Sequence, residues 1–171
     1  MEGYFPEYKI AEMAMAVEEK SIFFYSRLAE IVSQETTRNF FLELARWELK
    51  HKETLRVIAE AARNKEPLRV VDGASYAYVK ETIATMVKRA SDLISSRTLV
   101  DMGSEEKCID IALQYEHLVV ETYTNIDDSL HNPFGEVLSQ IIEEEKQHIR
   151  LLQEEKAKNR AKPAVAKRNT L

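Results

Sequence analysis

The chain has 171 residues, of which 44% are apolar, and it carries a formal net charge of −5. This length and apolar content suffice for one sizeable core, so we expect a single domain. Four glycines and four prolines are too few for many short strands joined by tight turns, and frequent Ala, Leu, Glu, Lys and Met favour helix. The composition therefore predicts an all-α fold.

The single cysteine, Cys108, excludes an internal disulfide and a cysteine-rich zinc or rubredoxin-type module in this chain. No apolar run approaches the roughly 20 residues that span a bilayer, and no apolar stretch follows a basic start. We expect no membrane association and a cytoplasmic location. Residues 155–171 are basic and the remainder is acidic, which disfavours nucleic acid as a partner. Residues 157–171 are expected to form a disordered tail.

Apolar residues recur at three- and four-residue steps in five segments, which predicts amphipathic helices. The predicted helices span about 8–32, 36–64, 76–96, 105–129 and 133–156. The run VSQETT separates the first two, and Ser33 or Thr36 is expected to cap the second. The run SLHNP separates the last two.

Two histidines stand in the same local pattern. Glu48 precedes His51 by three residues, and Glu145 precedes His148 by three. Residues three apart on a helix lie on nearly the same face, so both side chains of a pair can reach one point. A single such pair in a Glu-rich helix more often marks a solvated face or a local ion pair.

The surrounding sequence repeats as well. Glu18 is followed seven residues later by Tyr25, and Glu116 is followed seven residues later by Tyr123. The two glutamates are 98 residues apart and the two Glu-x-x-His histidines are 97 apart. This common layout indicates an internal duplication.

The spacing also predicts where the motifs meet. Residues on two antiparallel helices face each other when they are equidistant from the turn. The midpoint between Glu18 and the first Glu-x-x-His falls at 33–35, and that between Glu116 and the second at 130–132. Both midpoints lie in the predicted turns, about 22 Å from the motifs at 1.5 Å per residue. The site is therefore expected in the middle of the bundle.

Two such hairpins packed together offer four carboxylates and two imidazoles, the set used by di-iron and di-manganese carboxylate bundles. Four buried carboxylates would be unfavourable without cations, so two metal ions are expected. Iron is the first choice, and manganese or zinc remains an alternative. The expected catalytic and metal-ligating residues are Glu18, Glu48, His51, Glu116, Glu145 and His148.

Residues 65–104 are long enough to return the chain along the bundle. Their predicted helix, 76–96, would be about 31 Å long. A crossover of this kind between two hairpins gives a ferritin-like four-helix bundle over residues 1–156.

The segments EEKSIFFYSRLAE, FFLELARWELKHKETL, YEHLVVETY and IIEEEKQHIRLL resemble the rubrerythrin-like branch of the ferritin-like superfamily, over residues 8–155. The resemblance implies that Glu18 and Glu116 are terminal ligands and that the other two glutamates bridge the ions. Each histidine would bind one iron. Rubrerythrins reduce hydrogen peroxide with electrons from a rubredoxin-type centre, which this chain lacks, so the resemblance implies an external donor. It also implies a homodimer.

The family often carries another carboxylate one turn before the ligand on its third bundle helix, and Leu113 stands at that position here. The site thus resembles a symmetric ferroxidase centre more closely. Tyr25 and Tyr123 are expected either to hydrogen-bond a carboxylate or metal-bound oxygen, or to pack in the core. Trp47 is expected to pack or form an interface. The remaining histidines and nearby acids are expected at the surface: His117, His131, Glu19, Glu121, Glu143 and Glu144.

Three hypotheses follow. The first is a redox enzyme that reduces peroxide or dioxygen at a diferrous site. The second is a ferroxidase that handles iron for storage or delivery. The third is a metal-free helical scaffold whose glutamates pair with Lys and Arg.

Overall fold

The structure, a computed structural model, describes residues 4–6, 8–64, 70–95, 104–129 and 134–161. Five helices and two three-residue strands lie within these residues. In chain order they are β1 (Tyr4–Pro6), α1 (Tyr8–Ile31), α2 (Glu35–Arg63), β2 (Val70–Asp72), α3 (Gly73–Ile94), α5 (Glu105–Ser129) and α6 (Phe134–Ala161).

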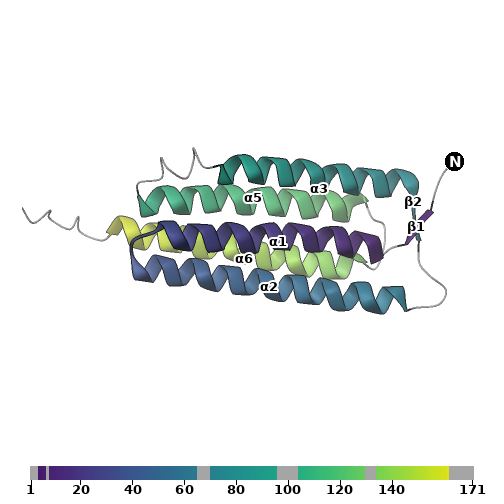
Figure 1. Cartoon of the computed structure of the whole chain (residues 1–171), viewed down its shortest axis with the longest axis horizontal. Helices are drawn as coiled ribbons and strands as arrows, with labels where there is room; N and C mark the ends of the chain where they lie inside the picture. The colour runs from purple at the N-terminus through teal and green to yellow at the C-terminus, as the bar shows by residue number, and fades with distance from the viewer. Residues whose placement is uncertain (1–3, 7, 65–69, 96–103, 130–133, 162–171) are drawn as a thin grey trace, which may run out of the picture.

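The four long helices form a bundle of two hairpins (Figure 1). The backbone of α1 lies closest to that of α2, and the backbone of α5 to that of α6, whereas the backbones of the two hairpins approach each other at fewer points. Helix α3 lies along the outside, against α5 and α1. The all-α, ferritin-like bundle of two hairpins and a long crossover is thereby confirmed.

The crossover determines how the hairpins are oriented. Helix α2 ends at the right of Figure 1, and α3 carries the chain back to the left, where α5 begins beside the α1–α2 turn. The helices α2 and α6 therefore run antiparallel, as do α1 and α5. The α1–α2 turn and the α5–α6 turn consequently lie at opposite ends of the bundle, and the motifs meet at one level because each lies near the middle of its helix.

A contact between the α1–α2 turn and the start of α5 was not expected from the sequence. The N-cap residue of α2 is Gln34, and neither it nor the expected caps close the helix with a side chain. Instead Glu105, in the first turn of α5, accepts hydrogen bonds from the backbone N–H groups of Ser33 and Gln34 at 3.0 and 2.9 Å. The prediction of Ser33 or Thr36 as the cap is wrong, because Gln34 is the N-cap residue and a carboxylate from the other hairpin binds the N–H groups just before the helix.

The strands are a second difference from the predicted all-helical chain. β1 and β2 pair antiparallel, with Phe5 opposite Val71. Phe5 also stacks on Tyr76 of α3, with ring centroids 4.0 Å apart. Each strand is only three residues long and its partner is distant in sequence, so no local pattern indicates the pairing.

Two helix ends also differ from the expected bounds. Helix α3 begins at Gly73, because the side chain of Asp72 accepts hydrogen bonds from the N–H groups of Ala74 and Ser75. Helix α6 continues to Ala161, so residues 157–161 are not part of a disordered tail. Arg160 there donates a hydrogen bond to Glu106 of α5 at 2.6 Å. The rest of the predicted tail, 162–171, lies outside the described residues.

The core is one apolar cluster that draws side chains from every described helix. Cys108 lies within it and is a free thiol. Among the described helices, none combines the length and apolar character needed to cross a bilayer. Halfway along the bundle, between the hairpins, the apolar cluster gives way to buried carboxylates and imidazoles.

Candidate metal centre

The six residues expected to bind metal lie together between the hairpins. Helix α1 contributes Glu18, α2 contributes Glu48 and His51, α5 contributes Glu116, and α6 the second Glu-x-x-His. All six are buried, and none is more than 4% exposed. They form two overlapping groups whose candidate ligand atoms lie within 4.8 Å of one another. The groups are Glu18, Glu48, His51 and Glu145, and Glu48, Glu116, Glu145 and His148.

The two glutamates that both groups share present one oxygen to each histidine. Nδ1 of His51 lies 3.0 Å from Oε1 of Glu145 and 3.4 Å from Oε2 of Glu48. Nδ1 of His148 lies 2.9 Å from Oε2 of Glu145 and 3.2 Å from Oε1 of Glu48. The imidazole rings lie nearly parallel, with centroids 5.5 Å apart. Each shared carboxylate thus faces both halves of the site.

The two remaining glutamates each belong to one half. Oε2 of Glu18 lies 3.9 Å from Nδ1 of His51, and Oε1 of Glu116 lies 3.6 Å from Nδ1 of His148. Each half therefore brings one imidazole nitrogen, one carboxylate of its own and two shared carboxylates to the same point.

Many atoms of this cluster have no hydrogen-bond partner. They are Glu18 Oε2, both oxygens of Glu48 and Glu145, Glu116 Oε2, and Nδ1 of His51 and His148. Burying such groups without partners is costly, and divalent cations among them would satisfy oxygen and nitrogen together. The donor set therefore fits two metal ions.

The electrostatics of the metal-free site also reflect crowded carboxylates. Burial, with the nearby Glu145 charge, raises the pKa of Glu116 to about 8. Burial, with Glu48 and Glu145, raises the pKa of Glu18 well above its usual value. Burial opposes charge on His51 too, but contacts with Glu145 and Glu48 outweigh it and raise the His51 pKa to about 11. Without metal, the cluster therefore binds protons near neutral pH.

Glu145 is the exception among these carboxylates. Burial raises its pKa, but the close imidazoles of His148 and His51 outweigh burial and lower the pKa to about 2. It therefore remains charged between the two imidazoles.

The two tyrosines bind carboxylates of the opposite half. Tyr25 of α1 donates a hydrogen bond to Glu116 of α5, and Tyr123 of α5 donates one to Glu18 of α1. Both tyrosines are completely buried. A role as hydrogen-bond donor to a carboxylate was expected, and the structure adds that each bond crosses between the hairpins.

Two residues next to the cluster, Trp47 and Glu144, contact its histidines. Trp47 is half-buried and stacks on His148, with ring centroids 5.2 Å apart. Glu144 was expected only to face solvent, but its Oε2 lies 2.8 Å from Nε2 of His51. The sequence contained one signal for both, since each residue immediately precedes the glutamate of a Glu-x-x-His motif.

The other neighbours lie farther out. His117 is exposed, as are three acids that pair with surface cations: Glu19 with Lys52, Glu121 with Arg89, and Glu143 with Lys146. His131 lies outside the described residues. Leu113 is half-buried against the core, so no carboxylate occupies that place. Sequence reasoning missed Tyr115, a buried neighbour of Glu116 whose hydroxyl lies 3.0 Å from that of Ser21.

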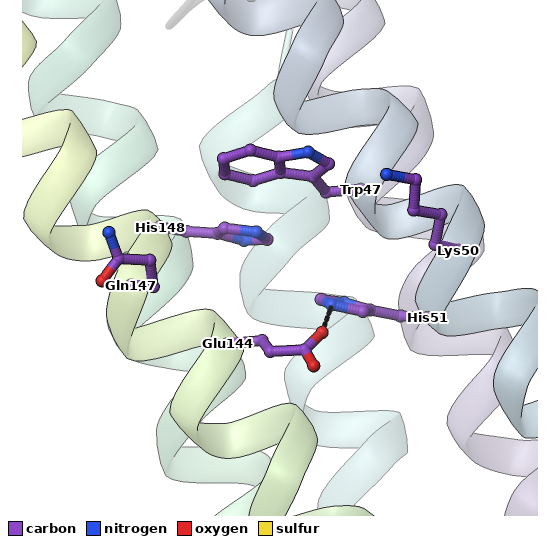
Figure 2. Close-up of a pocket in the computed structure, with 6 residues that line it drawn as sticks. All are labelled: Trp47, Lys50, His51, Glu144, Gln147 and His148. Carbon is purple, nitrogen blue, oxygen red and sulfur yellow. Dashed lines mark hydrogen bonds and ion pairs between the residues drawn. The ribbon is translucent and has the colours of Figure 1, made fainter.

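The histidines also border a cleft of about 270 Å³ between α2 and α6. Figure 2 shows the indole of Trp47 over His148, and Glu144 beside His51. Lys50 and Gln147 complete the lining. The site is thus enclosed by the core on its carboxylate side and borders the cleft at its imidazoles.

Together, the bundle and this cluster define a ferritin-like protein with a buried carboxylate and histidine site suited to two metal ions. The family model for rubrerythrin matches residues 9–156, and the chain belongs to the rubrerythrin family. A solved structure from Thermotoga maritima, of a proposed ferritin-like diiron-carboxylate protein, is similar, with 26% sequence identity and a TM-score of 0.59. The match covers 91% of this chain and 97% of that chain. The comparison with curated proteins finds no match.

Proposed function

We propose that this protein is a di-iron oxidoreductase that reduces hydrogen peroxide or dioxygen. The observation that carries the proposal is the buried cluster of unpartnered carboxylate oxygens and imidazole nitrogens, arranged as two overlapping ligand groups. Membership of the rubrerythrin family supports it.

The geometry of the cluster supports a role for each ligand. Glu48 and Glu145, whose two oxygens face different histidines, would bridge the two ions. Glu18 and Glu116 would each bind one ion, together with the histidine of the same group. Carboxylates and imidazoles suit iron or manganese, whereas a closed structural zinc site more often uses thiolates.

Iron bound there supplies the electrons that reduce the oxidant. The protein's part is to position and protect the site. The phenols of Tyr25 and Tyr123 orient the terminal carboxylates through their hydrogen bonds. The apolar core around them keeps bulk water from the carboxylate side. A small oxidant such as peroxide would approach through the cleft beside His51 and His148.

Turnover also needs electrons from outside the chain. Reduction of one hydrogen peroxide to two waters consumes two electrons and two protons, and the only cysteine is a buried free thiol. We therefore propose an external donor, such as a rubredoxin-type protein. A homodimer is the proposed assembly.

A ferroxidase that handles iron for storage or delivery is the second candidate. The observation that favours it is Leu113. A carboxylate at this position would give one half of the site an additional ligand, whereas leucine leaves the two halves with matched ligands. Such a protein would use dioxygen or peroxide to oxidise incoming Fe(II) and then release the product.

The test is to load the purified protein with Fe(II) without oxygen and to follow diferric absorbance after mixing with hydrogen peroxide or air-saturated buffer. Faster oxidation by peroxide supports the peroxidase, and faster oxidation by dioxygen favours the ferroxidase. The Glu48→Ala, Glu145→Ala double variant is the control and should bind no iron pair. Normal binding of two irons by that variant would refute the assigned site.

A further inference from the structure

Trp47 and Glu144 occupy the same position in the two halves of the repeat. Each residue immediately precedes the glutamate of a Glu-x-x-His motif. Each lies beside the histidine of the other half, Trp47 against His148 and Glu144 against His51. The pseudo-symmetric scaffold therefore places an indole on one imidazole and a carboxylate on the other (Figure 2).

The contact at His51 has a definite chemical consequence. Its Nδ1 faces the carboxylate cluster, so a metal bound there leaves the ring proton on Nε2. That N–H donates to Oε2 of Glu144 at 2.8 Å. Gln140, one turn away on α6, donates to the other oxygen of Glu144 at 2.9 Å and helps hold this carboxylate in place. A carboxylate that accepts from a ligand histidine fixes the ring and makes its other nitrogen a better donor to metal.

The contact at His148 lacks this feature. The indole of Trp47 lies nearly parallel to the ring, at an interplanar angle of 18°, and offers its face rather than an acceptor atom. Across the described part of the chain, Nε2 of His148 has no hydrogen bond or ion pair. The indole can exclude water from the ring but does not increase its basicity.

We propose that Glu144 is a positioning residue that makes the two metal positions unequal, so that the position at His51 binds its metal more tightly than the position at His148. The inference rests on the proposed di-metal function. Glu144 is half-exposed, at 47% of its side-chain surface, which weakens the interaction by solvent screening. We therefore expect an effect of about tenfold, at the lower end of the range for such partners.

The test uses the whole metal-free protein and Co(II), whose visible absorption bands report the ligands around it. Calorimetry gives the affinity and absorption gives the coordination. Two backgrounds isolate the positions: His148→Ala keeps the position at His51, and His51→Ala keeps the position at His148. Isolating them prevents cooperativity between the two ions from obscuring the difference.

In the His148→Ala background, Glu144→Leu should weaken Co(II) binding about tenfold and shift the absorption bands. Glu144→Gln should restore part of the affinity, because its amide oxygen still accepts the hydrogen bond. In the His51→Ala background, the same two changes should alter the affinity by less than about twofold, as expected for uncoupled groups. Trp47→Glu is the converse variant, because it places a carboxylate beside His148. It should increase the Co(II) affinity in the His51→Ala background.

The outcomes separate the inference from the function on which it rests. Equal loss from Glu144→Leu in both backgrounds, or loss in neither, would overturn the inference while the di-metal site stands. A lower melting temperature with unchanged Co(II) affinity would show that Glu144 acts only in the fold, and would overturn it too. Failure of the unaltered protein to bind Co(II) or Fe(II) would refute the proposed function itself.

Discussion

Tyr25 and Tyr123 each donate a hydrogen bond to a buried glutamate of the other hairpin. Oε2 of each of these glutamates has no hydrogen-bond partner. The phenols are therefore important for keeping the terminal carboxylates oriented whether or not metal is bound. Their own pKa values are raised, mainly by burial, so both remain donors.

Removing one phenol should expose its importance. Tyr25→Phe leaves Glu116 without this donor, and an unsatisfied buried polar group costs about 1–3 kcal/mol. We expect the free energy of unfolding of the metal-free protein, measured with urea, to fall by that amount. Tyr78→Phe is the control, since Tyr78 is 46% exposed and should change little. Unchanged stability in Tyr25→Phe would contradict the crossed bond.

Metal binding should release protons near neutral pH. In the metal-free protein the pKa of Glu116 is about 8 and that of His51 about 11, so both hold protons that a metal must displace. Metal affinity should therefore rise as pH increases from 6 towards 9. Calorimetry in buffers of different ionisation enthalpy measures the protons released, and none at pH 7 would contradict this electrostatic picture.

The raised pKa values also determine whether the metal-free protein gains or loses stability as pH rises. A group whose pKa is higher in the folded state stabilises the fold at low pH and loses that contribution as pH rises through the folded value. For Glu116 this window extends from its ordinary value of 4.5 up to about 8. The metal-free protein should thus become less stable over that range by urea unfolding, and rising stability would be the contrary result.

Most of this site could be predicted from residue spacing, because helical periodicity alone decides which side chains share a face. The inward position of Glu18, Glu48 and His51 could be predicted from the first hairpin alone. The crossed tyrosine bonds and the Glu144 contact could not be predicted in this way, since they depend on how closely the two hairpins approach each other. Glu144 does not lie on the inward face of its own helix, but its side chain reaches His51 on the neighbouring helix.

At the scale of elements, Glu105 joins the start of α5 to the turn between α1 and α2. Its Oε1 also accepts a hydrogen bond from the hydroxyl of Ser33 at 2.9 Å. The backbone N–H groups of Ser33 and Gln34, just before α2, are thereby satisfied by a residue about 70 positions away. The first hairpin thus depends on the second for the closure of one helix end.

Glu105→Ala should therefore lower the free energy of unfolding by about 1 kcal/mol, the typical net contribution of a hydrogen bond. Urea or thermal unfolding measures it. Glu81→Ala is the matched control, since Glu81 is an exposed helical glutamate that makes no hydrogen bond or ion pair among the described residues. Equal stability of the two variants would mean that the turn does not need this carboxylate.

Helix ends were harder to predict than helix interiors for a related reason. The apolar periodicity of α1 and α2 covers many turns and does not depend on the neighbours. The end of α6 is supported by a contact of Arg160 with α5, and the start of α3 by Asp72 after a strand. Such contacts carry no periodic signal, so composition alone assigned residues 157–161 to a tail.

Across the whole molecule, the two hairpins meet through α3, through the shared apolar core and through the buried polar cluster. The backbones of α1 and α5, and of α2 and α6, approach closely at few points, but side chains pack between them, as where Phe24 stacks on Tyr115 with ring centroids 4.1 Å apart. The arrangement of hairpins and crossover could be predicted, because each motif lies near the middle of its helices and residues 65–104 are long enough to return the chain along the bundle. The short sheet formed by β1 and β2 could not, since its pairing joins distant segments.

Because the cluster joins the hairpins, metal should stabilise the entire fold. Ions that bind only the folded chain add stability that grows with concentration, about 4 kcal/mol at one thousand times the dissociation constant. Urea unfolding with Fe(II) under nitrogen, and again after a chelator, measures the difference. The Glu48→Ala, Glu145→Ala variant should show none. Equal unfolding of the loaded and stripped protein would show that folding and metal binding are uncoupled.

The crossed tyrosine bonds also bear on the origin of such a chain. Because Tyr25 serves Glu116 while Tyr123 serves Glu18, two identical hairpins related by a two-fold axis would make the same pair of bonds. A gene for one hairpin could therefore encode a complete symmetric site as a dimer. Tandem fusion through a crossover would preserve both crossed bonds and allow the two copies to differ, as residues 47 and 144 do.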